Sequence, residues 1–290
     1  GGAAMEMPEN VFGETEVQAR VALLEQLRAR HSDSQASEVF IESEAFDRHT
    51  SEVLTRGSAF YKTLMSIYAD DSVANKPAAI QAAVQEYLSD DRHSVAALPK
   101  STSYLLEHPQ ANALVMGYPL LRGFLWSNQW LELAALEALI LDTVDSNARG
   151  GGVVTVLERY WNKIGSPGGM SMFPAPVELP MVPAIAPNLY SQSPEAAYIL
   201  DNLAVLETMV TDIQAYPFLE NRQELIDQAV AEFTNKDDNL AQVLDYLYFA
   251  LRGGIYNQGG PATGELMASE RNRSRSAMGM QHVMIMSTPQ

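Results

Sequence analysis

Apolar residues recur every three or four positions along most of the chain, which is the spacing of one face of an α-helix. Between Glu14 and His31 these residues are Val17, Val21, Leu24 and Leu27. A second such pattern runs from Ser34 to Ala69, where Gly57 marks a bend or a close contact. The spacing predicts an all-α fold, a helical bundle body of about eight or nine helices.

The middle of the chain is its most apolar stretch. Few polar residues interrupt the range from Leu114 to Val144, which predicts a central pair of buried helices. Further on, Ser193-Pro194-Glu195 is a favourable helix start, with serine as N-cap and proline at the first helical position. The break at Tyr216-Pro217 then separates two helices of an antiparallel three-helix unit.

A proline-rich stretch divides the chain. Seven of its fifteen prolines lie between Ser166 and Pro194, so we expect an extended, polyproline-like strap there. The last thirty-odd residues show little periodicity and predict an extended tail. The predicted organisation is an N-terminal arm (1–13), a helical domain (14–165), the Pro-rich strap (166–194), a three-helix unit packing on the first domain (195–256) and an extended C-terminal tail (257–290).

Composition narrows the classes of function. The formal net charge of −17 repels nucleic acid and anionic lipid over most of the surface, so a nucleic-acid contact is expected only locally, through the arginine-containing tail. No apolar run reaches the roughly 18 residues of a membrane span. The chain has no cysteine, which excludes thiol catalysis and thiolate metal sites.

No sequence pattern of a catalytic or cofactor site is present. The chain lacks the G-x-S-x-G motif of nucleophile elbows and the Glu-x-x-His motif of di-iron bundles, so we predict no catalytic residue and no cofactor. The pairs Asp47/His49 and Asp91/His93 do not share a helical face and are expected to be surface residues. A helical enzyme using the carboxylates of Glu132 and Glu137 is a further hypothesis.

Methionines occur as alternating pairs in segments without helical periodicity, at positions 5 and 7, 170 and 172, 278 and 280, and 284 and 286. Thioethers with an imidazole suit Cu(I), and alternate residues of an extended chain point to the same side. The candidate copper ligands are Met278, Met280, His282, Met284 and Met286. Methionine is also an adaptable packing residue, so a tail docked in a groove of a neighbour is the favoured interpretation.

Three arginines precede the two methionine pairs of the tail in a chain that has only nineteen basic residues. Arginine pairs with carboxylates in a bidentate manner, so we expect this segment to bind the acidic body of its own or a neighbouring subunit. The candidate interaction residues are Arg271, Arg273, Arg275, Met278, Met280, Val283, Met284 and Met286.

These observations lead to two hypotheses. The first is a non-enzymatic structural or interaction protein, a subunit of a larger assembly such as a virion or other particle, whose extended termini contact protein partners or copies of itself. The alternative is an extracytoplasmic protein that handles copper through the tail. The segment from Ala59 to Ile80, in which Asp70-Asp71 separates two helices, resembles scaffold or core segments of tailed-phage head proteins. This resemblance implies an assembly role.

The amino terminus does not identify the cellular compartment of the protein. The chain begins with Gly1, so we expect either a processed product or a cloning remnant before a start at Met5. A processed chain in the periplasm, outside the cell or in an assembled particle fits the sequence as well as a cytoplasmic chain does.

Overall fold

The computed structural model describes residues 11–15, 17, 45–100, 108–144, 179–237 and 246. The regular elements in these ranges are all helices, which confirms the predicted all-α fold class. The predicted C-terminal tail and most of the N-terminal arm lie outside the described residues. The helices are α2 (Arg48–Ala69), α3 (Lys76–Leu88), α5 (Ala113–Gly117), α6 (Pro119–Val144), α8 (Val182–Ile185), α9 (Pro187–Gln192), α10 (Pro194–Ala215) and α11 (Arg222–Thr234).

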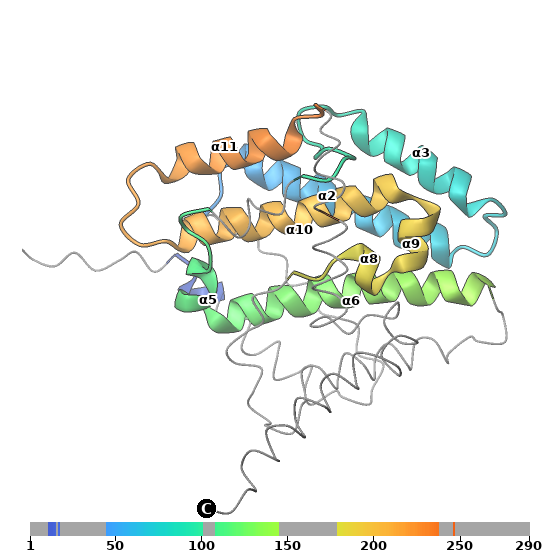
Figure 1. Ribbon diagram of the computed structural model, residues 1–290, viewed down its shortest axis with the longest axis horizontal. Helices are drawn as coiled ribbons and strands as arrows, with labels where there is room; N and C mark the ends of the chain where they lie inside the picture. Colours follow the sequence, from blue (N-terminus) through green and yellow to red (C-terminus); the bar gives the residue numbers. More distant parts are fainter. Residues whose placement is uncertain are drawn as a thin grey trace, which may run out of the picture.

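Helix α10 lies at the centre of the body (Figure 1), where it packs against α2, α5, α9 and α11. Fifteen of its 22 residues are buried, on all sides of the helix. The predicted central helix pair between Leu114 and Val144 is instead one long helix, α6, which follows the short helix α5. Tyr118 separates the two helices, and Pro119 starts the second because proline fits the first helical turn.

Local side chains set several helix boundaries. The long helix expected from Ser34 is interrupted at residues 45–47, because the carboxylate of Asp47 accepts hydrogen bonds from the backbone N–H groups of His49 and Thr50 and starts α2 at Arg48. The predicted start of α10 is confirmed, since Ser193 Oγ accepts from Ala196 N.

The predicted strap is helical over part of its described residues, while Met181, directly before α8, keeps an extended backbone. Residues 182–192 form α8 and α9 instead of an extended polyproline conformation. The prediction failed here because Pro183 and Pro187 both lie in the first turn of a short helix, where the missing N–H needs no partner. Residues 166–178 lie outside the described part of the chain.

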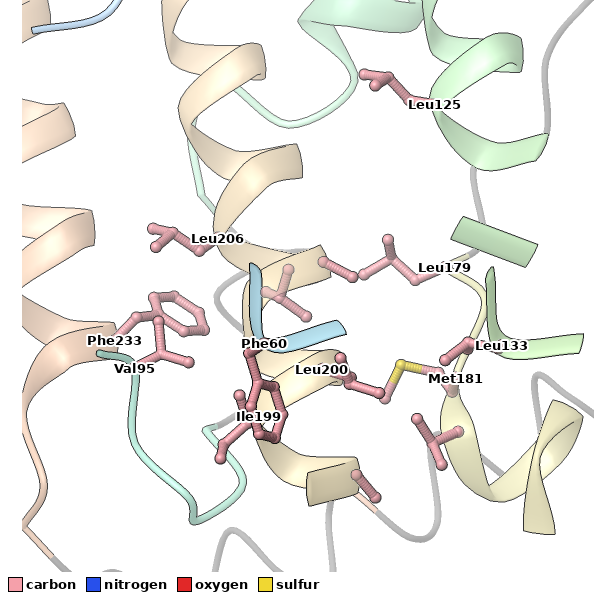
Figure 2. Packing of buried hydrophobic residues seen from close by; sticks show 14 of the residues in the cluster. Phe60, Val95, Leu125, Leu133, Leu179, Met181, Ile199, Leu200, Leu206 and Phe233 are labelled. Carbon is pink, nitrogen blue, oxygen red and sulfur yellow. The ribbon is translucent and has the colours of Figure 1, made fainter. Parts of the chain in front are cut away.

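The core forms around α10. Figure 2 shows Phe60 of α2 close to Ile199 of α10, and Phe233 of α11 close to Val95. Gly57 of α2 is buried, and a Cβ atom at this position would lie 2.5 Å from Leu203 Cδ2 of α10, which confirms the close contact predicted at this glycine. None of the helices in the described ranges combines the length and apolar character that a membrane span requires.

Candidate functional site

Three buried carboxylates are the first candidates for chemistry. Glu137 on α6 and Asp201 and Asp212 on α10 expose 1%, 1% and 4% of their surface. A buried carboxylate with a perturbed pKa is typical of catalytic sites, but it is also typical of structural hydrogen-bond networks. Their hydrogen-bond partners distinguish the two interpretations.

Asp201 holds the start of α8. Its two carboxylate oxygens lie 3.0 and 3.1 Å from Val182 N, and the hydroxyl of Tyr246 donates to Oδ2. Met181, the residue before α8, supplies no side-chain cap for this helix. Burial raises the pKa of Asp201 to about 7, while the hydrogen bonds from Tyr246 and Val182 oppose this shift. The carboxylate therefore serves as a cap from a distant helix.

Glu137 holds the start of α9 in the same way. Its Oε2 lies 3.2 Å from Asn188 N, and the side-chain amide of Asn188 donates to Oε1. Ala186 cannot cap this helix through its side chain. Burial raises the pKa of Glu137, against the opposing hydrogen bonds from Asn188.

Asp212 holds the start of α5. Its Oδ1 lies 2.9 Å from Leu114 N, and its Oδ2 lies 3.3 Å from both Asn112 N and His108 Nε2. Asn112 has a φ of 67° and does not cap the helix with its own side chain. Three helices without a local side-chain cap thus start on three buried carboxylates from α6 and α10.

The structure separates the two carboxylates of the enzyme hypothesis. Glu137 is buried and accepts a hydrogen bond from Asn188, whereas Glu132, five residues earlier on α6, is exposed. Within the described ranges, no three histidine or acidic side chains are placed to hold a metal ion. The hydrogen bonds of Glu137, Asp201 and Asp212 account for these carboxylates as helix caps.

His93 forms a bridge that the sequence did not predict. Its Nδ1 lies 2.8 Å from Asp90 Oδ2 and its Nε2 lies 2.9 Å from Glu52 Oε2 of α2, while the ring packs against His49 with centroids 5.3 Å apart. We expected His93 to be a surface residue beside Asp91, but it is partly buried and bonds to Asp90 instead. The i,i+3 spacing of Asp90 and His93 is the sequence signal of this contact.

Basic side chains hold the carboxyl ends of four helices. Helices α2, α3, α10 and α11 are described over their full lengths, and none has a basic residue in its last turn. The cations come from other segments: Lys76 donates to Ile67 O of α2, Arg56 to Tyr87 O of α3, Arg222 to Tyr216 O after α10 and Lys236 to Thr234 O of α11. They satisfy unpaired carbonyls at the negative ends of the helix dipoles.

We predict that Arg56→Met lowers the free energy of unfolding by about 1–2 kcal/mol, because the Arg56 guanidinium donates to Glu86 O at 2.7 Å and to Tyr87 O at 2.8 Å. Urea denaturation measures this change. The matched control is Arg48→Met on the same helix, which removes only an exposed pair with Glu52 and should change the free energy of unfolding far less. Equal losses in both variants would contradict the capping role of Arg56.

The described residues expose four large apolar side chains, and we call this set the apolar end. The exposed fractions are 63% for Val17, 83% for Met116, 38% for Tyr216 and 67% for Phe218. Phe218 also has a φ of 59°, a left-handed conformation that costs an aromatic residue free energy. Folding of the body accounts for neither the exposure nor the strain.

Asp212 connects the segments that carry Met116 and Tyr216. Asp212 is hydrogen-bonded to Leu114 N, two residues before Met116, and lies one helical turn before Tyr216. Phe218 follows in the turn between α10 and α11. Figure 1 shows α5 and this turn together at the left end of the body.

The segment that carries Val17 reaches the same end through Phe12. Phe12 packs against Tyr118, the residue after α5, with ring centroids 5.5 Å apart, and against Phe46 at 6.3 Å. Gln223 at the start of α11 donates to Asp47 Oδ1, beside Phe46. The starts of α2 and α11, the end of α5 and the segment near Phe12 therefore meet at one end of the molecule.

Exposed carboxylates border the apolar end. Glu14 lies one helical turn before Val17, and Glu220 and Glu224 follow Phe218 within two turns; all three are exposed. A ligand with apolar anchors and positive charge would complement this surface.

The candidate residues of the tail, Arg271 to Met286, lie outside the described residues, so both the copper site and the docking interpretation stay predictions. Comparison with protein-family models, curated proteins and solved structures found no match for this chain.

Proposed function

We propose that this protein is a non-enzymatic structural or interaction protein, a subunit that assembles with protein partners or copies of itself through its apolar end. The observation that carries the proposal is that Val17, Met116, Tyr216 and Phe218 are exposed on segments that meet at one end of the molecule. Exposed apolar residues scattered singly need no explanation, but a cluster bordered by polar residues is typical of protein interaction sites. Methionine and aromatic residues are also the types enriched at such sites.

The buried polar groups support the same proposal. The carboxylates of Glu137, Asp201 and Asp212 each accept hydrogen bonds from a helix start, which is a structural use. The rigid body that results holds α5 and the turn after α10 in fixed positions, and a preorganised surface loses less conformational entropy on binding.

The test is the concentration dependence of mass in solution, measured by sedimentation equilibrium. We expect the full chain to self-associate and the variant Met116→Asp/Phe218→Asp to associate at least 10-fold more weakly, because each new carboxylate would have to be desolvated at the interface. The control is Gln85→Asp/Ala82→Asp, which adds the same charge on exposed positions of α3. A chain that is monomeric at all concentrations and binds no protein partner would refute the proposal.

A further inference from the structure

We infer that the apolar end receives the C-terminal segment 271–290 of a neighbouring copy of this chain. This inference rests on the proposed function, because it names the partner of the same surface. The argument uses the size of the apolar end, the charge around it and the composition of the segment.

The apolar end is large enough to anchor a partner. The four exposed fractions, with ~150–250 Å² for a large side chain, give on the order of 500 Å² of apolar surface. A stable contact buries about 800 Å² on each partner, of which about 57% is apolar. The apolar end therefore supplies the apolar share of one such contact, and a peptide that binds with a few apolar anchors and polar flanks can use it.

The composition of segment 271–290 matches the surface. It contains four methionines, Val283 and Ile285 as apolar anchors, and the unbranched methionine side chain adapts to an irregular surface. In an extended conformation, Met278 and Met280 point to one side, as do Met284 and Met286. Paired anchors of this kind can cover Met116 and Phe218.

The charges are complementary as well. Segment 271–290 has three arginines and no acidic residue, although the whole chain has a formal net charge of −17. Its arginines precede the methionines, so anchored methionines place them within reach of the border of Glu14, Glu220 and Glu224. Arginine forms bidentate hydrogen bonds with carboxylates, and this contact offsets the repulsion between two acidic bodies.

A contact between the tail of one copy and the apolar end of the next joins two different surfaces. Such heterologous contacts produce closed rings or open filaments. Tyr246, the last described residue, is fixed on Asp201, and the 25 residues from there to Arg271 span up to about 80 Å when extended. This length is sufficient to reach a neighbouring copy.

The test is a charge exchange in the full chain. One variant carries Arg271→Glu, Arg273→Glu and Arg275→Glu, and the other carries Glu220→Arg and Glu224→Arg. We expect each variant alone to associate at least 10-fold more weakly than the natural chain, and an equimolar mixture to recover association, because every tail then finds a border of opposite charge. The control Asp71→Arg/Glu195→Arg changes exposed carboxylates elsewhere on the body and should leave association unchanged.

The outcomes separate this inference from the proposed function. If Met116→Asp/Phe218→Asp weakens association but the arginine variant does not, the apolar end binds another partner and the tail inference is wrong. A third variant carries all five changes in one chain. If this variant recovers association but the mixture does not, the tail docks within its own copy, which also overturns the inference. A natural chain that never self-associates overturns this inference, and it removes the proposed function itself only if the chain also binds no protein partner.

Discussion

Asp201→Ala is expected to lower the free energy of unfolding by about 2–5 kcal/mol at pH 5.5, because it leaves Val182 N and the Tyr246 hydroxyl buried without their acceptor. Urea denaturation followed by circular dichroism measures the loss. Asp201→Asn is the matched control, since its side-chain carbonyl retains one acceptor and its cost should stay below about 1 kcal/mol. Equal losses in both variants would show that the carbonyl oxygen at this position does not hold α8.

The pH dependence of the same variant tests the charge of Asp201. Its pKa is raised from 3.8 to about 7 by burial, so the folded state binds the proton more tightly than the unfolded chain does. The resulting stabilisation is complete below pH 3.8 and is lost as the pH rises through 7. Within this interval the natural chain loses up to about 1.4 kcal/mol per pH unit.

Asp201→Asn has no such proton to lose. The difference in free energy of unfolding between Asp201→Asn and the natural chain should therefore shift in favour of the variant by about 2–3 kcal/mol from pH 5 to pH 7. The pKa values of Glu137 and Glu207 are also raised, mainly by burial, but both residues are present in the two proteins and cancel in the comparison. A difference that stays constant over this range would mean that Asp201 titrates near its ordinary pKa.

The sequence predicted those parts of the fold that depend on neighbouring residues. Helical periodicity placed Ile199, Leu206 and Ile213 on buried positions of α10, and all three are buried. Asn75, a residue type that favours the N-cap position, caps α3, where its side chain accepts from Ala78 N. These features depend on contacts within one or two helical turns, so the local pattern contains them.

The helix caps that come from residues distant in sequence could not be predicted in this way. The backbone N–H of Val182 donates to Asp201, 19 residues away, and that of Asn188 donates to Glu137, 51 residues away. The N–H of Leu114 donates to Asp212, 98 residues away. No spacing rule relates such positions, because tertiary packing alone brings them together. The one local signal is a helix start without a capping side chain, as at Ala186-Pro187, and this signal was hidden by the expectation of an extended strap.

The apolar end was also missed, for a related reason. Met116, Tyr216 and Phe218 continue the apolar patterns of their segments, and nothing in their spacing distinguishes an exposed position from a buried one. Their exposure depends on how α5 and the turn after α10 pack on the body, and contacts between distant residues, such as Asp212 with Leu114 N, contribute to this packing. The sequence predicted that the tail docks on a protein surface, and this stays a prediction because the tail lies outside the described residues.

Asp212→Ala is expected to weaken association through α5. The change removes the acceptor of Asn112 N and Leu114 N and the partner of His108 Nε2, so a five-residue helix loses the cap that ties it to α10. An isolated helix of this length is unstable. We therefore expect the free energy of opening α5 locally to fall by about 2–4 kcal/mol. Hydrogen exchange of residues 112–118 measures this opening.

Local opening of α5 releases Met116 from its fixed place in the apolar end. We therefore expect Asp212→Ala to associate about 10-fold more weakly than the natural chain, since binding must then order α5 again. Asp227→Ala, which removes an exposed carboxylate of α11, is the control and should change neither exchange nor association. Faster exchange at 112–118 with unchanged association would show that the contact bypasses α5, whereas unchanged exchange would show that Phe12 and Tyr118 hold this helix without Asp212.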